Sequence, residues 1–247
     1  MLHHVYRSLS AALNAAVAEQ LLVRNPCQGI TAPRRAEFEA KTLTVEQSQR
    51  LLAVARDHPI GPLLTVALST GMRAGELLAL TWADVDFERG LITVNKSVKW
   101  LPHGKHQVGS TKTRSSRRTI AVGGPAIRAL IHQHHHCLKM ELHATRWESH
   151  DLVFPSIHGT FTVPQGKFVR DFRSLLAKAG CPQIRFHDLR HTAGLFLTRS
   201  VGVVVASRVL GHSTPTITTT FYGHAQPEDF TAAARAMGEL LDAGGGS

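Results

Sequence analysis

The sequence is poor in cysteine and has no long apolar run. Its 247 residues include only three cysteines, Cys27, Cys137 and Cys181, which lie far apart in the chain. An odd number of widely spaced cysteines favours neither a disulfide framework nor a Cys-x-x-Cys metal site, so a reducing environment suits the chain. No apolar run approaches the roughly 18 residues that a membrane span requires, and the N-terminal segment lacks the apolar core of a secretion signal. We therefore expect a cytoplasmic protein with no membrane partner.

Acidic residues are also scarce, and the common nucleotide-binding motifs are missing. There are 18 acidic residues against 28 lysines and arginines, which gives a formal net charge of +10. This charge favours a polyanion such as nucleic acid as the partner, although an ordinary basic enzyme would fit it too. Neither GxxxxGK[ST] nor GxGxxG occurs, so nucleotide hydrolysis has no support.

Two groups of residues raise the question of a metal site. Asp84, Asp86 and Glu88 are the only tightly clustered acids, but they precede an expected strand, where aspartate commonly bonds to the local backbone. His132 and His136 have the i, i+4 spacing of zinc ligands, yet no clear third and fourth ligand accompanies them. We predict structural acids, a polar histidine stripe, and neither a metal nor another cofactor.

The N-terminal part of the chain is predicted to be separate from the rest. Residues 1–24 place apolar side chains at helical spacing up to Asn25-Pro26, where the residue before proline leaves the helical conformation. Residues 25–41 contain two prolines and a glycine without a sustained period, which is typical of a linker. The helical pattern starts without a capping residue, so we expect the sequence to begin inside something longer. Residues 42–247 are the predicted main domain.

The main domain is predicted to be mainly α-helical with one small antiparallel β-sheet, an α+β fold. Thr44 and Gln47 match a capping box, Pro62 and Gly71 bracket a second helix, and Pro125 opens a long one. The β-branched stretches LITVNKSVKW and RRTIAV, separated by the glycine-containing loop PHGKHQVGST, predict the sheet. Further helices are expected at 164–179, 187–200, 203–210 and 227–242, and near the TTTFY segment.

Several side chains of this domain suit phosphodiester chemistry without a metal ion. Such chemistry needs fixed cations, a nucleophile and a proton donor for the leaving alkoxide. His187 and Arg190 are three residues apart, which on a helix places both on one face. Arg73 stands two residues after Gly71, which is expected to end a helix. The phenol of Tyr222 is a competent covalent nucleophile.

Four segments containing these residues occur in the order GMRAGELLALTWADVDFERG, STKTRSSRRTIAV, FHDLRHTAG and LGHSTPTITTTFYGH. Together they resemble the tyrosine recombinases, or phage integrase family, over about residues 42–240. The resemblance implies the catalytic-domain fold of the DNA breaking-rejoining enzymes and double-stranded DNA as the partner. Residues 1–34 look like the last helix and exit linker of the core-binding domain that precedes the catalytic domain in this family.

The resemblance also implies roles at the scissile phosphate. Arg73 and Arg190 would hold its non-bridging oxygens, a task suited to planar guanidinium groups, and His212 would add a further donor. Tyr222 would attack phosphorus and form a 3′-phosphotyrosyl link, with His187 as the general acid or base beside it.

The leaving 5′-hydroxyl needs a proton, and the resemblance implies Lys112 as its source. Lys96, Lys99 and Lys105 share the hairpin region, but the Thr-Lys-Thr context favours Lys112. Because bond energy stays in the covalent intermediate, rejoining would need neither ATP nor metal.

Other charged residues are predicted to support the site. Glu76, three residues after Arg73, is expected to orient that arginine through an ion pair rather than to act in catalysis. Five arginines are predicted to contact the DNA backbone and to add affinity without sequence choice, with a solvated face as the alternative for the hairpin arginines. They are Arg34, Arg35, Arg114, Arg117 and Arg118.

The leading hypothesis is a site-specific DNA recombinase or integrase of a bacterial or phage mobile element, acting at the nucleoid. By the same resemblance, the helix at 227–242 would pack onto a neighbouring protomer in a tetramer on DNA, or fold back onto its own domain. The alternatives are a non-catalytic DNA-binding regulator, a decayed integrase and a type IB topoisomerase. The complete set of site residues favours an enzyme, and the short interval from His212 to Tyr222 favours a recombinase.

Overall fold

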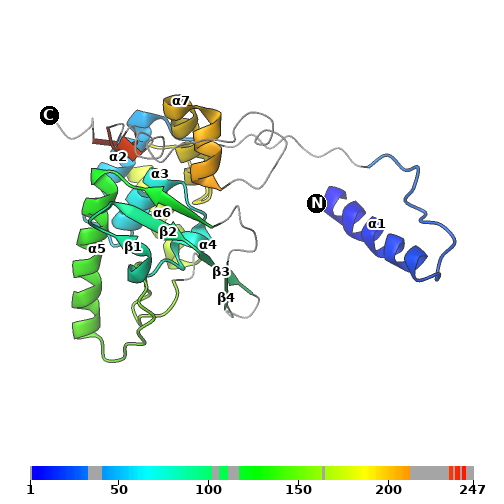
Figure 1. The fold of residues 1–247 in the computed structure, drawn as a ribbon, viewed down its shortest axis with the longest axis horizontal. Helices are drawn as coiled ribbons and strands as arrows, with labels where there is room; N and C mark the ends of the chain where they lie inside the picture. The colour runs from blue at the N-terminus through cyan, green and yellow to red at the C-terminus, as the bar shows by residue number, and fades with distance from the viewer. Residues whose placement is uncertain are drawn as a thin grey trace. The chain divides into compact units, whose positions relative to one another are not determined.

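The computed structural model divides the chain into two compact units, Met1–Ala40 and Lys41–Ser247 (Figure 1). The residues that it describes are 2–32, 41–101, 106–110, 117–162, 165–211, 234–235, 237–239 and 241–242. The predicted helices near TTTFY and over most of 227–242 lie outside these residues.

The first unit contains helix α1 (Leu2–Ala18), drawn in blue in Figure 1. The prediction of a helix is confirmed, but it ends before the predicted residue 24. Gln20 adopts a left-handed conformation with a φ of 60°. The Leu21 amide then donates to the Ala16 carbonyl at 2.8 Å, which closes the last turn and stops the helix. The apolar period extends past this turn, so periodicity alone overestimates the length.

The second unit is mainly helical, as predicted. Its described helices are α2 (Val45–Ala55), α3 (Gly61–Thr70), α4 (Ala74–Leu77), the 3₁₀ turn η1 (Trp82–Asp84), α5 (Gly124–His143), α6 (Lys167–Lys178) and α7 (Asp188–Leu210). The capping box of α2 is confirmed: the Gln47 amide donates to Thr44 Oγ1 at 3.2 Å, and the Thr44 amide donates to Gln47 Oε1 at 2.9 Å. Gly71, with a φ of 60°, ends α3 where the sequence predicts.

The strands form two small antiparallel sheets instead of the single predicted one. Strands β1 (Val85–Asp86), β2 (Leu91–Val94) and β5 (Arg118–Ala121) lie in the order β1-β2-β5, and β3 (Lys96–Trp100) pairs with β4 (His106–Ser110). The prediction of a loop over PHGKHQVGST is wrong for its second half, which is β4. Val98 and Val108 face each other in this pair, and Val98 is buried. The local glycine signal is overridden because β3 supplies a partner for the ladder.

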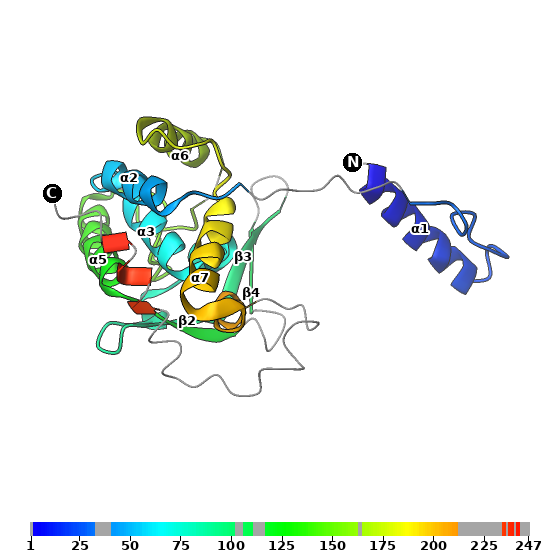
Figure 2. The ribbon, with the colours of Figure 1, turned by 90° about the horizontal axis from the view of Figure 1, so that it is seen from above.

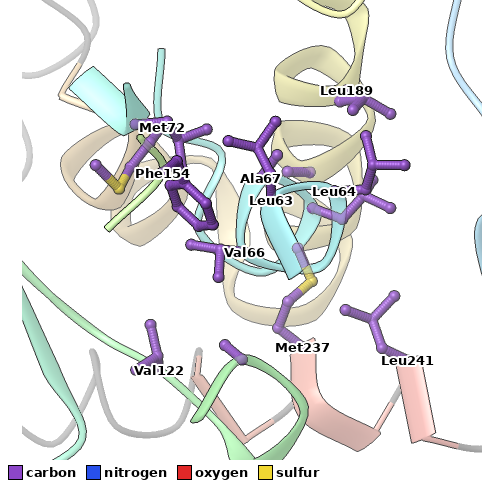
Figure 3. Packing of buried hydrophobic residues seen from close by; sticks show 14 of the residues in the cluster. Leu63, Leu64, Val66, Ala67, Met72, Val122, Phe154, Leu189, Met237 and Leu241 are labelled. Atoms are coloured by element: carbon purple, nitrogen blue, oxygen red, sulfur yellow. The ribbon is translucent and has the colours of Figure 1, made fainter. Parts of the chain in front are cut away.

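Helix α3 lies at the centre of the core, between α5 and α7 (Figure 2). Eight of its ten residues are buried, so the helix is apolar on nearly all sides. Figure 3 shows its side chains among Leu189 of α7 and the C-terminal residues Met237 and Leu241. Met237 and Leu241 are 2% and 8% exposed. These two described C-terminal residues therefore pack against their own domain.

Helix α7 is interrupted at Gly202, which has a φ of 81° and separates the two helices that the sequence predicts there. By length and mean hydropathy, α7 is the one helix among the described residues that reaches the range of a membrane span. Its buried residues include Arg190 and Phe196, which pack inside the domain. The same hydropathy is typical of a core helix, and we assign α7 that role.

Gly75 allows α4 to lie directly on β3. A Cβ at this position would lie 2.5 Å from the Val98 carbonyl oxygen and 2.7 Å from Ser97 Oγ. We predict that Gly75→Ala lowers the free energy of unfolding by about 1–3 kcal/mol, as overpacking does in other cores. Urea unfolding measures this change. Gly109→Ala is the matched control, because a Cβ there meets no atom within 4 Å, and equal midpoints for the two variants would refute the prediction.

Candidate active site

Arg73 and Glu76 are held together at the start of α4. Gly71 turns the chain out of α3, and Arg73 is the residue that precedes α4. The Arg73 amide donates to Glu76 Oε2 at 2.9 Å, and Arg73 Nη1 lies 2.9 Å from Glu76 Oε1. The ion pair expected between these residues is present. It leaves the Arg73 side chain 37% exposed, so this guanidinium is available to a ligand.

Arg118 lies inside the domain, and the expectation that it contacts DNA at the surface does not fit this geometry. Its side chain is 7% exposed. Arg118 Nη2 and Nη1 lie 2.8 Å and 3.3 Å from the two carboxylate oxygens of Glu76, and Nε donates to the Val209 carbonyl at 2.6 Å. A buried carboxylate attracts a guanidinium because two parallel N–H groups match its two oxygens. Arg117, the preceding residue, is exposed.

Arg190 is buried, and its charge is not balanced by a direct ion pair within the described part of the chain. Its Nη1 donates to the Gly71 carbonyl at 2.7 Å, and its Nη2 donates to the Leu210 carbonyl at 2.8 Å. Burial and the nearby charge of Arg73 lower the pKa of Arg190 to about 9. The group therefore stays positively charged at neutral pH.

The site carries an excess of positive charge. Burial raises the pKa of Glu76, but the hydrogen bonds and charge of Arg118, together with the bonds from Arg73, outweigh it and hold this pKa below its ordinary value. Glu76 is thus ionised at neutral pH. Among the described residues, one carboxylate faces three guanidinium groups, on Arg73, Arg118 and Arg190, which leaves two positive charges in excess. Such an excess beside a partly exposed arginine is suited to binding an anion.

His187 precedes α7 and stands three residues before Arg190, as expected. The residue is exposed overall, but one side of its ring is covered, and the ring meets that of His191 edge-on at a centroid distance of 5.4 Å. Partial burial and the charges of His191 and Arg190 lower the pKa of His187, and Asp188 opposes them. His187 is therefore neutral at physiological pH and able to accept a proton.

Asp188 fixes the start of α7, and sequence reasoning missed it. The buried carboxylate accepts hydrogen bonds from the Arg185 amide and from Arg185 Nη2, both at 2.8 Å. These bonds outweigh burial and keep the pKa of Asp188 below its ordinary value. A carboxylate in the first turn also complements the positive end of the helix dipole. The signal was the acidic residue directly after His187, at the start of a predicted helix.

The remaining predicted site residues lie outside the described residues. They are Lys112, His212 and Tyr222, together with Arg34, Arg35 and Arg114. Gly211 is described, and His212 is the next residue in the chain. The roles of these six residues stay predictions.

Asp84 has structural partners. Thr81 Oγ1 donates to its carboxylate at 2.6 Å, Lys96 Nζ lies 2.9 Å away, and Asn95 Nδ2 donates at 2.9 Å. Across the described ranges, no three His, Cys, Asp or Glu side chains are grouped to hold a metal ion. The interpretation of Asp84 as a turn-stabilising residue agrees with these contacts.

Comparison with known sequences places the chain among integrases. The profile of the phage integrase family matches residues 41–229. A tyrosine recombinase XerC-like protein of Caldanaerobacter subterraneus is 29% identical over 94% of this chain and 64% of its own length. The ICEBs1 integrase of Bacillus subtilis is 27% identical over 97% of this chain and 65% of its own length. The chain thus spans just under two thirds of these curated relatives.

Solved structures share the fold at low sequence identity. The Tn1549 transposon integrase in complex with transposon right end DNA matches with a TM-score of 0.71, at 22% identity over 96% of this chain and 77% of that chain. A lambda integrase dimer bound to a core site matches with a TM-score of 0.58, at 18% identity over 90% and 74% of the two chains. These likenesses confirm the predicted α+β fold. With the profile match over most of its length, the chain belongs to the phage integrase family, the tyrosine recombinases.

Proposed function

We propose that this chain is a site-specific DNA recombinase that cleaves and rejoins strands through a 3′-phosphotyrosyl intermediate. The observation that carries the proposal is the buried charge of Arg190, which no direct ion pair balances in the described part of the site. An unpaired buried charge is unfavourable and persists where a ligand of opposite charge completes the site. Arg73 is the partly exposed neighbour of Arg190, and we expect a phosphate to contact Arg73 and Arg190 together.

Side chains can supply every nucleophile, proton donor and proton acceptor that the proposed reaction requires. Arg73 and Arg190, with His212, hold the non-bridging oxygens, whose charge increases in the transition state. The Tyr222 oxygen forms a bond to phosphorus, and the bond from phosphorus to the 5′-oxygen breaks. His187 takes the phenol proton, and Lys112 gives a proton to the leaving 5′-oxygen. A 5′-hydroxyl of another strand reverses these steps and releases Tyr222.

The proposed assembly is a tetramer on double-stranded DNA, coupled through residues 227–242, in a bacterial cytoplasm where the DNA substrate is present. A solved lambda integrase tetramer is bound to a Holliday junction. In this chain Met237 and Leu241 are buried, and Asp242 pairs with Arg128 at 2.6 Å. This segment therefore has to leave its own domain before it packs onto a neighbour.

Covalent trapping tests the proposal. The full chain is incubated with nicked duplexes of pooled sequence and with supercoiled plasmid, without divalent metal, and adducts are mapped by peptide mass. We expect an adduct between Tyr222 and a 3′-phosphate that Tyr222→Phe abolishes. Tyr6→Phe is the matched control, because the sequence has two tyrosines, and it should retain the adduct.

Other outcomes favour the alternatives. Salt-sensitive DNA binding without any adduct would favour a non-catalytic regulator. Plasmid relaxation through Tyr222 without strand exchange between duplexes would favour a topoisomerase.

A further inference from the structure

Three arginines from different parts of the fold hold the C-terminal end of α7. The carbonyl groups of Val209, Leu210 and Gly211 each accept a hydrogen bond from a different guanidinium. The donors are Arg118 Nε at 2.6 Å, Arg190 Nη2 at 2.8 Å and Arg73 Nη2 at 3.1 Å, in that order. Arg73, Arg118 and Arg190 are called the arginine clamp below.

The arginine clamp donates hydrogen bonds to backbone carbonyls at the end of α7. The last carbonyls of an α-helix have no partner within the helix, and the negative end of the helix dipole favours cations. Three donors on consecutive carbonyls fix the position of the last residues of α7 and of Gly211. The next residue is His212, a predicted phosphate ligand.

Arg118 differs from the other two members of the clamp. Both carboxylate oxygens of Glu76 lie within 3.3 Å of its Nη atoms, so its charge is balanced. Glu76 in turn orients Arg73. A Cβ on Gly211 would lie 3.0 Å from Arg118 Nη1, which shows how closely this side chain packs on the end of α7. Arg118 thus joins β5, α4 and α7 through one planar group.

We propose that Arg118 is a positioning residue of the proposed reaction and not a DNA contact. It holds the end of α7, up to Gly211, in register with Arg73 and Arg190. The inference rests on the proposed function, because the groups it positions are the predicted phosphate ligands. A lysine in its place has all its donors on one nitrogen, so it cannot bind both oxygens of Glu76 and the Val209 carbonyl at the same time.

The experiment uses the full chain with Arg118→Lys and Arg118→Met, and with Arg89→Lys and Arg89→Met as controls. Arg89 carries the same charge in an exposed turn, where its side chain is 78% exposed. Three quantities are measured: hydrogen exchange of the peptide covering 205–211, the salt dependence of binding to a random-sequence duplex, and the rate of adduct formation on nicked duplexes at saturating protein. Arg117→Met serves as the reference for a surface phosphate contact. All values are taken where circular dichroism shows a folded protein.

Both Arg118 variants should speed exchange in the last turn of α7 by about tenfold or more, because local opening becomes easier. Adduct formation should fall by about ten- to a hundredfold, the effect of a displacement near 1 Å, with Arg118→Lys the less affected of the two. The salt slope of binding should stay at the wild-type value. The Arg89 variants should leave exchange and adduct rate unchanged.

A lost phosphate contact gives a different result. It reduces the slope of log K against log salt by about 0.9, as we expect for Arg117→Met. The proposal is overturned if Arg118→Met shows this reduction, or if exchange at 205–211 stays at the wild-type rate in both Arg118 variants. Hydrogen exchange and the salt slope can be measured without catalysis. If the wild-type chain forms no adduct, the proposed function is refuted, but these two measurements still show whether Arg118 positions α7 or contacts DNA.

Discussion

We expect Arg190→Met to lower the rate of adduct formation at saturating DNA by about 10³-fold or more, as loss of a principal cation does at other phosphoryl-transfer sites. The reason is the position of the charge. Arg190 is buried and reaches the Gly71 and Leu210 carbonyls with two different nitrogens, so a phosphate oxygen meets a group already fixed in place. Arg190→Lys should lose nearly as much, because an ammonium cannot span both carbonyls and the phosphate. Single-turnover trapping on nicked duplexes measures the rate.

The same substitution should leave stability nearly unchanged. Removing two hydrogen bonds destabilises the protein, but removing a buried charge that lacks a direct ion pair stabilises it. We expect the free energy of unfolding to change by less than about 1.5 kcal/mol. A large rate loss at constant stability would show that the loss does not come from unfolding. A rate within tenfold of wild type for the folded variant would contradict the proposed role of Arg190.

Glu76→Ala should have the largest effect on stability. It removes the one carboxylate that faces the arginine clamp in the described part of the chain, and it leaves three guanidinium groups together, two of them buried. Breaking a buried pair in this way costs about 3–5 kcal/mol. Urea unfolding at neutral pH measures the change. Asp86→Ala is the control, because Asp86 pairs with Arg89 at the surface at 4.0 Å, and such a pair contributes at most about 1 kcal/mol.

The contribution of Glu76 should also depend on pH. Because its pKa in the folded protein lies below the ordinary value of 4.5, the contribution is fully present above pH 4.5 and is lost as pH falls through the folded pKa. The stability gap between wild type and Glu76→Gln should therefore be constant from pH 7 to pH 5 and shrink at lower pH. A gap that widens on acidification would show instead that folding raises the pKa of Glu76.

Local signals predicted the described helices of the main domain well. The capping box at Thr44 and the helix end at Gly71 each depend on a few adjacent residues, and the structure shows both. Strand pairing was harder to predict from local sequence. Strand β4 forms because β3 lies beside it, and a loop signal within β4 carries no information about that partner. The end of α1 likewise depended on the conformation of Gln20, which an apolar period does not reveal.

The sequence by itself determined the family and the α+β class, and it predicted which residues would bind a phosphate, because these follow from residue types in a fixed order. Only the tertiary structure decided which groups these residues contact. Arg118 reaches Val209 across 91 residues, and Arg73 reaches Gly211 across 138. The acceptors are backbone carbonyls, which every residue carries, so no side chain marks them in advance. Arg118 and Arg117 look alike in sequence, and the buried carboxylate of Glu76 turns one inward and leaves the other exposed.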